Sequence, residues 1–388
     1  MNPTPEKAPL PAGISDQLPP HAAFEAHIVN RLMAAFAGHG YERVKPPLIE
    51  FEDTLLGGGG ATLAEQTFRL MDPVSQRMLA LRPDMTLQIA RIAQTRLTNR
   101  PRPLRLGYAG QVVRVSGSQL RFERQFGQVG AEIIGATSPA ADAEVIVMAT
   151  EALRALGMSG LTVDLGLPTL VPAILADHRL DPEQWSHIRA ALDRKDEAAI
   201  SNLAAVIGET SKALLTSLVS ATGRAAPAID ALQRLPLPEA AQSERAELIK
   251  VFQRVAGETA DLTISIDPLE NRGFEYHTGV TFTLFARDVR GELGRGGRYM
   301  AGMADADGEP ATGVSLFMDS ILRALPAPSV ARRIFLPAGT PAAEGGRLRA
   351  DGWVTVSGLD EASDPAKNAR LQRCTHVFID GAPHKVDT

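Results

Sequence analysis

The chain has 388 residues, of which 44% are hydrophobic and 22% are charged, a composition typical of a globular protein with more than one domain. No apolar run reaches the roughly 18 to 20 residues of a membrane-spanning helix, and no basic segment leads into an apolar one at the N-terminus, so we expect a cytoplasmic protein without a membrane partner. The net charge of −5 speaks against broad contact with nucleic-acid phosphates.

Cysteine and histidine usage limits the chemistry further. The single cysteine, Cys374, excludes an intrachain disulfide framework, and we expect it to be a buried, unreactive thiol. The eight histidines have no metal-ligand spacing, so the sequence predicts no metal site.

The N-terminal part of the chain alternates helices with strands. Residues 1–20 are rich in proline and are expected to be extended. A helix is predicted over residues 21–38 from helical spacing of its apolar side chains, which are Phe24, Ile28, Leu32, Met33 and Phe36. We predict strands at "YERVKPPLIEF", "TFRLMD" and "MLALRPDMT", and a helix at residues 85–96. The segment "GGGGATLAEQ" is expected to be a flexible loop able to close over a ligand.

A charged β-hairpin is predicted at residues 108–135, with β-rich runs on both sides of a Ser-Gly-Ser turn. Its charged and polar residues include Arg114, Arg121, Gln128 and Glu132. Gln128 and Glu132 are four apart on one strand, so their side chains should point to the same face of the sheet. Such a hairpin either lies at a solvated edge or lines a pocket for a small polar ligand.

The sequence after residue 138 indicates the remaining elements of the fold. A helix at residues 139–156, capped by Ser138 with Pro139 in its first position, is followed by the strand "LTVDLG". A mostly helical block spans about residues 169–256, and strands resume at "DLTISIDP", "FEYHTGVTFTLFA" and "GELGRGGRY", with a helix after "ATGVSL". This order predicts an α+β fold with a mixed, largely antiparallel sheet, helices on one side and a helical insertion. We expect a core at residues 1–325, a linker at 326–331 and a small α/β domain at 332–388.

Several segments resemble a known family. "PAGISDQLPP", the helix after it and "VKPPLIEF" resemble motif 1 of the class II aminoacyl-tRNA synthetases, and the hairpin resembles their motif 2. "LRPDMTLQIAR", "RLGYAGQVVRV", "FERQFGQVGAEIIG", "RGFEYHTG" and "GRGGRY" resemble the histidyl-tRNA synthetases in the same order. The resemblance implies a class II synthetase-like sheet with flanking helices, a dimer contact at residues 21–51 and a truncated anticodon-binding-like domain at the C-terminus. The alternative for the helix at 21–38 is a face within the chain's own core.

The resemblance also implies a histidine site. Asp84 stands where the family has an acidic residue near the amino group of the substrate, and Thr86 follows at the expected interval. Gln128 and Glu132 match residues that meet the amino group and the imidazole. Arg272 matches the arginine that faces the substrate carboxylate.

Three further residues complete this predicted site. Arg114 matches the motif 2 arginine, which also adjoins the carboxylate, and Tyr276 and His277 stand where the family commonly has two tyrosines. A zwitterion with a two-nitrogen ring needs carboxylates, a cation and a polarisable wall, and these residues offer that set. The alternative is a solvated sheet face with surface ion pairs.

The nucleotide half of the family site does not carry over. Ser116 stands in place of a glutamate that contacts adenine, Ser320 in place of an arginine that holds the γ-phosphate, and Phe317 in place of a glycine. Serine cannot supply a permanently charged fork, and phenylalanine prevents the close approach that glycine permits. We therefore expect no ATP cofactor and no adenylation. Arg323 lies almost a full helical turn from the lost arginine.

A synthetase-like chain that keeps the amino-acid site and loses the ATP site resembles the regulatory subunits of ATP phosphoribosyltransferase, the first enzyme of histidine biosynthesis. That resemblance implies no catalysis by the chain alone, a hetero-octamer with the short-form catalytic subunit, and histidine as feedback inhibitor. A tRNA partner is not expected, because the tail has few basic side chains and no interleaved aromatics. The alternatives are a histidyl-tRNA synthetase or another ATP-dependent histidine-activating ligase, and an RNA-binding relic of a synthetase.

Overall fold

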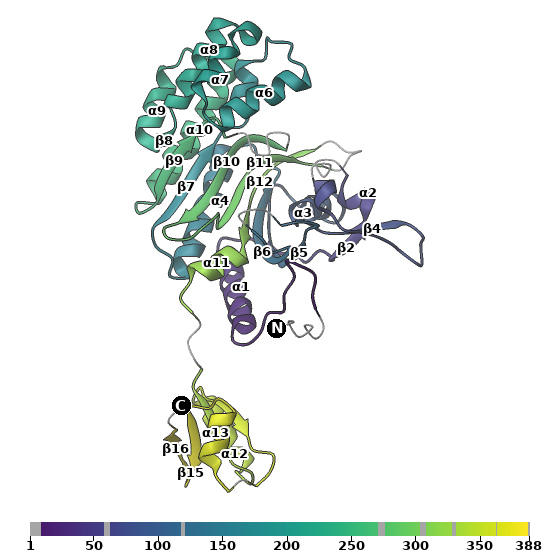
Figure 1. Ribbon diagram of the computed structural model, residues 1–388, viewed down its shortest axis with the longest axis vertical. Coiled ribbons are helices and arrows are strands. Elements are labelled where there is room, and N and C mark those ends of the chain that lie inside the picture. Colours follow the sequence, from purple (N-terminus) through teal and green to yellow (C-terminus); the bar gives the residue numbers. More distant parts are fainter. Residues whose placement is uncertain are drawn as a thin grey trace, which may run out of the picture. The chain divides into compact units, whose positions relative to one another are not determined.

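The computed structural model describes residues 9–57, 63–117, 121–270, 276–302, 308–327, 331–361 and 363–386. The chain divides into two compact units, Met1–Pro326 and Ala327–Thr388. Both are drawn in Figure 1.

A nine-stranded sheet forms the centre of the first unit, in the order β1-β5-β6-β12-β11-β10-β7-β9-β8. The strands in that order are β1 (Glu42–Arg43), β5 (Leu104–Val113), β6 (Gln125–Ile134), β12 (Glu309–Phe317), β11 (Gly294–Ala301), β10 (His277–Ala286), β7 (Leu161–Gly166), β9 (Thr263–Asp267) and β8 (Gly223–Arg224). The strands from β5 to β7 pair antiparallel, whereas β1 with β5 and β7 with β9 pair parallel. The predicted mixed, largely antiparallel sheet is therefore confirmed, and β5 with β6 is the predicted hairpin.

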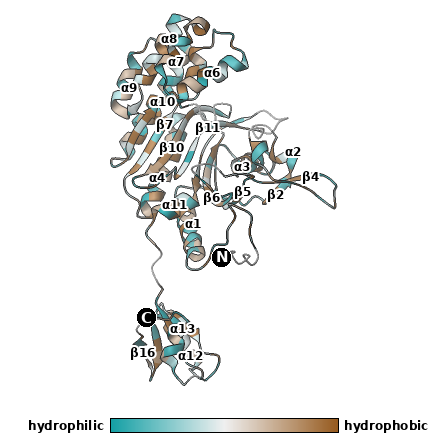
Figure 2. Ribbon diagram, in the orientation of Figure 1, coloured by the Kyte–Doolittle hydropathy of each residue, from teal (hydrophilic) through white to brown (hydrophobic). Residues whose placement is uncertain are grey.

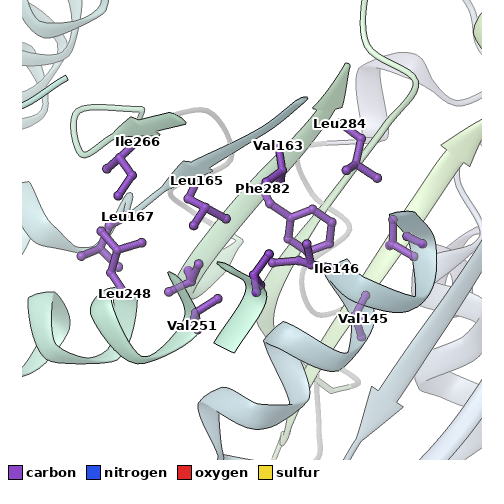
Figure 3. Packing of buried hydrophobic residues seen from close by; sticks show 14 of the residues in the cluster. Val145, Ile146, Val163, Leu165, Leu167, Leu248, Val251, Ile266, Phe282 and Leu284 are labelled. Carbon is purple, nitrogen blue, oxygen red and sulfur yellow. The ribbon is translucent and has the colours of Figure 1, made fainter. Parts of the chain in front are cut away.

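The main core lies between this sheet and the helices α1 (His21–Gly38), α4 (Pro139–Ala155) and α10 (Glu239–Glu258). Figure 3 shows Ile146 of α4 beside Phe282 of β10, and Val251 of α10 near Leu165 of β7. Figure 2 shows hydrophobic residues along these central strands. Fully burying such a side chain contributes roughly 1.5–3 kcal/mol.

Two helix starts and one helix face agree with the sequence. Helix α1 has the predicted bounds, and Ser138 caps α4 by accepting a hydrogen bond from the Ala140 N–H at 3.2 Å. The apolar residues Leu32 and Phe36 of α1 are fully buried in the chain's own core. The alternative reading of this face is thus correct, and its apolar side chains are not free to form a dimer contact.

The opposite face of the sheet also carries a helix, which corrects the prediction of helices on one side only. Helix α3 (Thr86–Thr95) packs there, and Ile89 forms a second core cluster with Tyr108 and Tyr299. On β6, Val129 and Ala131 face the main core, whereas Gln128 and Glu132 face the α3 side. The predicted shared orientation of Gln128 and Glu132 is confirmed.

A small sheet stands beside the large one, in the order β2-β4-β3, with β2 (Ile49–Phe51), β3 (Arg69–Met71) and β4 (Met78–Leu81). The short helix α2 (Glu52–Leu55) follows β2. The prediction of one strand across "YERVKPPLIEF" is wrong, because the segment splits into β1 and β2, which belong to different sheets. The intervening Pro46 and Pro47 have no backbone N–H to donate to a strand ladder.

The helical block contains α5 (Leu170–Ile174), α6 (Pro182–Asp193), α7 (Glu197–Asn202), α8 (Ala204–Ser220) and α9 (Ala225–Arg234). The short strand β8 interrupts it, and α10 leaves it to pack against α4 and β10. After β12 the chain enters α11 (Met318–Ala324). No helix in the described ranges is long and apolar enough to cross a bilayer.

The second unit is a small α/β sandwich. Its sheet has the order β14-β13-β15-β16, with β13 (Arg333–Leu336), β14 (Val354–Ser357), β15 (His376–Ile379) and β16 (Ala382–Lys385). Helices α12 (Ala342–Ala350) and α13 (Pro365–Leu371) accompany the strands. Cys374 is free and 1% exposed, as predicted for a buried thiol.

Candidate functional site

A cavity of about 380 Å³ lies on the α3 side of the large sheet, within the range of roughly 300–1,000 Å³ that is usual for small-molecule sites. Strands β6, β10, β11 and β12, the start of α3 and nearby connecting segments form its wall. The wall residues are Leu63, Gln66, Asp84, Thr86, Leu87, Glu132, Glu270, Tyr276, His277, Thr281, Phe282, Thr283, Glu292, Arg295, Gly296, Gly297, Tyr299, Gly313, Val314 and Ser315.

A buried carboxyl group forms one end of the cavity. Glu132 is 1% exposed, and its two oxygens accept hydrogen bonds from Tyr108 Oη at 3.1 Å and Tyr299 Oη at 3.0 Å. Burial raises the pKa of Glu132 to about 8, and the nearby Asp84 carboxylate adds to this, while the two tyrosine hydroxyls oppose it. Glu132 is therefore largely protonated at pH 7 in the chain without ligand, and a cationic ligand beside it would favour its ionised form.

A second carboxylate is fixed in place by a polar network. Gln128 Nε2 donates to Asp84 Oδ2 at 3.0 Å and to Ser315 Oγ at 2.7 Å, and Gln128 Oε1 accepts from the Met85 N–H at 3.1 Å. The Thr86 N–H donates to Asp84 Oδ1 at 2.8 Å. Two acidic side chains thus converge on one end of the cavity, as a ligand ammonium or ring N–H requires.

Aromatic rings form a second part of the wall. Tyr276 stacks on Tyr299 with ring centroids 5.0 Å apart, and His277 meets Tyr276 edge-on at 5.2 Å. The buried Oη of Tyr276 has no hydrogen-bond partner among the described residues. His277 Nδ1 lies 3.2 Å from the carbonyl oxygen of Arg298, and burial lowers the pKa of His277 to about 4, so this ring is neutral at pH 7. The wall therefore offers a polarisable surface and one unpaired hydroxyl.

Arginines lie on another side. Arg295 lines the cavity and is exposed. Arg114 is not among the wall residues, and its Nε donates to the Pro83 carbonyl at 3.2 Å. Burial lowers the pKa of Arg114, whereas Asp84 raises it. Arg298 is engaged elsewhere, in an ion pair with Asp142 at 2.6 Å.

Near Phe317, where the sequence predicts that the nucleotide site of the family is lost, aromatic rings and ion-paired arginines pack together. Phe317 is 1% exposed and meets Phe126 edge-on with ring centroids 6.0 Å apart. The guanidinium of Arg121 lies 4.0 Å from the Phe317 ring centroid and pairs with Asp319 at 3.0 Å. Arg323 contacts the same Asp319 at 3.3 Å.

The structure thus gathers most of the predicted site. Asp84, Thr86, Glu132, Tyr276 and His277 line the cavity, Gln128 bonds to Asp84 beside it, Arg114 lies behind the wall, and Arg272 falls outside the described residues. The loop "GGGGATLAEQ", predicted to close over a ligand, contributes Leu63 and Gln66 to the wall. The segment "GELGRGG" contributes Glu292, Arg295, Gly296 and Gly297. Residues 58–62 of the first segment lie outside the described part.

Three site residues were not predicted from the sequence: Tyr108, Tyr299 and Ser315. Tyr108 lies opposite Gly130 in the hairpin, and Tyr299 follows the glycine pair of β11. A cross-strand aromatic beside glycine is a usable signal, because the missing Cβ leaves room for the ring. A Cβ at Gly130 would collide with the Tyr108 ring.

Comparisons with known proteins agree with one another. The family model described as "Histidyl-tRNA synthetase" matches residues 13–321. A relative from Paramagnetospirillum magneticum named "ATP phosphoribosyltransferase regulatory subunit" is 56% identical over 376 residues, which cover 97% of this chain and 97% of the relative. The crystal structure of "an ATP phosphoribosyltransferase regulatory subunit/histidyl-tRNA synthetase" from Bacillus halodurans is 26% identical with a TM-score of 0.83, covering 97% of this chain and 98% of that chain. A chain of the "ATP phosphoribosyl transferase (HisG:HisZ) complex" from Thermotoga maritima shares the fold, with a TM-score of 0.59 and 18% identity over 76% of this chain and 97% of that chain.

Proposed function

This chain belongs to the histidyl-tRNA synthetase family and, within it, to the ATP phosphoribosyltransferase regulatory subunits, and from this premise we propose that it binds histidine and regulates that transferase. The family recognised from the motifs and its class II synthetase-like α+β fold are confirmed. In the proposed role the chain serves the first step of histidine biosynthesis in the cytoplasm, has no catalytic activity alone and mediates feedback inhibition by histidine.

The observation that carries the proposal is the pairing of a buried carboxyl group with a cavity of amino-acid size. Glu132, held by Tyr108 and Tyr299, and Asp84, held by Gln128, supply acceptors for an ammonium group and an imidazole N–H. The predicted histidine site, which adds Thr86, Arg114, Arg272, Tyr276 and His277, is retained as part of this proposal.

The packing around Phe317 supports the absence of nucleotide chemistry. A triphosphate needs cations with free donors, and the Arg121 guanidinium is stacked on Phe317 and paired with Asp319. Ser320, in the place of the lost arginine, is 1% exposed and accepts from Arg323 Nη2 at 3.0 Å. We propose that the chain uses no ATP cofactor and charges no tRNA.

The proposed partner is the short-form catalytic subunit of the transferase, in a hetero-octamer. The relative from Paramagnetospirillum magneticum is named a regulatory subunit, which supports a catalytic counterpart. Histidine can shift the conformational equilibrium of such a complex only if it binds one conformation more tightly than another. The coupling free energy between an effector site and a second site is typically about 1–3 kcal/mol. The two segments that border the cavity, at Leu63–Gln66 and at Glu292–Gly297, are the proposed moving parts.

Self-association as a dimer is proposed at the small sheet rather than through the apolar face of α1. Six large apolar side chains on and beside its strands are exposed: Leu48, Ile49, Leu70, Met71, Val74 and Met78. Exposed apolar clusters of this kind mark protein contacts. β2 also lies within the residues 21–51 for which motif 1 predicts the contact. Light scattering should give twice the mass of one chain for the wild type. A Leu70→Glu/Met71→Glu variant should give the mass of one chain.

The function is tested by combining purified chain with the catalytic subunit. We expect calorimetry to show histidine binding to the chain alone, transferase activity to require the chain, and histidine to inhibit the complex. Exchange of pyrophosphate into ATP in the presence of histidine would instead identify an active ligase. Strongly salt-dependent affinity for tRNA would favour the RNA-binding alternative.

A further inference from the structure

We propose that Arg295 makes the cavity selective for ligands with a free carboxylate, an inference that rests on the proposed histidine site and assigns a role within it. Arg295 lies on β11, opposite Ser315 of β12 and Thr283 of β10. Paired residues of neighbouring strands share a face. Because Ser315 Oγ lies 3.2 Å from Tyr108 Oη and accepts from Gln128, Arg295 emerges on the same face as the acidic end of the cavity.

Glu132 and Arg295 lie at separate places along the cavity, whose wall also includes the carboxylates Glu270 and Glu292. Glu132 lies two strands from β11, opposite Gly313, which in turn lies opposite Gly297. With strands about 4.8 Å apart and Arg295 two residues along β11 from Gly297, the Cα atoms of Glu132 and Arg295 are roughly 12 Å apart. This span accommodates a free amino acid with its ammonium or imidazole at Glu132 and its carboxylate at Arg295.

Among the described residues, Arg295 is also the arginine that lines the wall. Arg298, on the same strand, is committed to Asp142 and to the carbonyl oxygens of Ala136 and Ser138. Arg114 lies behind the wall and is held by the Pro83 carbonyl.

The guanidinium of Arg295 keeps its donors for a ligand. Within the described ranges its Cζ lies 6.0 Å from the centroid of the Phe317 ring, and no described carboxylate, Glu292 included, forms an ion pair with it. A guanidinium with free donors at a cavity wall suits the two oxygens of a carboxylate, which it can hold through parallel hydrogen bonds.

The test compares two ligands that share the imidazole and the amine and differ in the carboxylate, L-histidine and histamine. By calorimetry, the wild-type chain should bind histidine at least about tenfold more tightly than histamine, since a charge-assisted hydrogen bond accounts for a factor of this size. Arg295→Gln should reduce histidine affinity at least about tenfold and leave histamine affinity unchanged. Arg295→Lys should retain an intermediate preference.

Arg290→Gln is the matched control, because Arg290 is an exposed arginine of the connection that leads into β11 and does not line the cavity. It should bind both ligands like the wild type. If Arg295→Gln keeps the wild-type ratio of histidine to histamine affinity, the role of Arg295 is overturned and the histidine site stands. If the wild-type chain binds neither ligand while thermal unfolding shows it folded, the proposed histidine site itself is overturned.

Discussion

Glu132 on β6 lies directly against Gly313 on β12, and the two residues are opposite each other in the sheet. A Cβ at position 313 would overlap the carboxylate oxygen Oε2, which is the atom that accepts from Tyr299. The glycine is therefore a condition for the position of the carboxyl group. No other residue permits both the strand pairing and this hydrogen bond.

Gly313→Ala should consequently displace Glu132 and abolish histidine binding. We expect a loss of about 1–3 kcal/mol in the free energy of unfolding, which is usual for overpacking a filled site. Denaturant titration and calorimetry measure the two effects. Gly257→Ala in α10 is the control, since its Cβ meets nothing within 4 Å, and it should bind histidine normally. Normal histidine binding by the Gly313 variant would refute the dependence on Glu132.

Tyr276→Phe separates function from stability. The hydroxyl of Tyr276 is buried without a partner among the described residues, so its removal should leave the free energy of unfolding unchanged or raise it by up to about 1 kcal/mol. If the hydroxyl serves a ligand, histidine affinity should fall about tenfold. Tyr299→Phe should instead lower stability, because it removes the donor to Glu132. Equal histidine affinity in Tyr276→Phe and wild type would exclude a ligand contact.

Arg272→Ala tests the site residue that the resemblance predicts outside the described ranges. We expect weaker histidine binding, because the family places this cation at the substrate carboxylate, with assembly with the catalytic subunit intact. Calorimetry measures the first effect and gel filtration of the mixed subunits the second. Unchanged histidine affinity would count against the inherited pocket.

How far the sequence predicts this site depends on the separation of its parts. The orientation of Gln128 and Glu132 follows from the two-residue period of one strand, and the structure confirms it. The bonds from Tyr108 to Ser315 and from Tyr299 to Glu132 join residues 207 and 167 positions apart. Strand periodicity gives the face of each side chain but not which strands are neighbours, so these partners were not predicted.

The same limit applies to the fold. Local signals were sufficient for α1 and for the cap of α4, because helical spacing and Ser138 act within a few residues. They were insufficient at "YERVKPPLIEF", where β1 pairs with β5 and β2 with β4. The prediction of helices on one side failed for a similar reason, since α3 packs on the second face through Met85 and Ile89.

Asp319→Asn should show how much the Arg121–Asp319 ion pair, at the position of the lost nucleotide site, contributes to the free energy of unfolding. The Arg121–Asp319 pair is nearly buried, with side chains 10% and 9% exposed, and removing one partner of a buried pair typically costs about 3 kcal/mol. Denaturant titration should show a loss of this order. Glu247→Gln, which removes an exposed pair with Lys250, should change stability by less than about 0.5 kcal/mol. Similar losses in both variants would mean that the Arg121 pair contributes no more than a surface contact.

The buried carboxyl group should also make stability depend on pH in a defined window. The pKa of Glu132 is raised from 4.5 to about 8, so the folded chain binds more protons than the unfolded chain between these values, and stability falls as pH rises through them. His277 acts in the opposite direction, because its pKa is lowered from 6.5 to about 4 and stability rises between these values. The two effects overlap below pH 6.5, so the effect of Glu132 is separate from that of His277 only between pH 6.5 and 8.

Glu132→Gln isolates this effect, since the amide cannot ionise and Asp84, Tyr108 and Tyr299 remain around it. Between pH 6.5 and 8 the free energy of unfolding of the wild type should fall relative to the variant, with a slope of at most roughly 1.4 kcal/mol per pH unit. Denaturant titrations of both proteins across this range measure the difference. Parallel curves would mean that Glu132 does not titrate there, and the carboxyl group would then be ionised throughout the range in which histidine is bound.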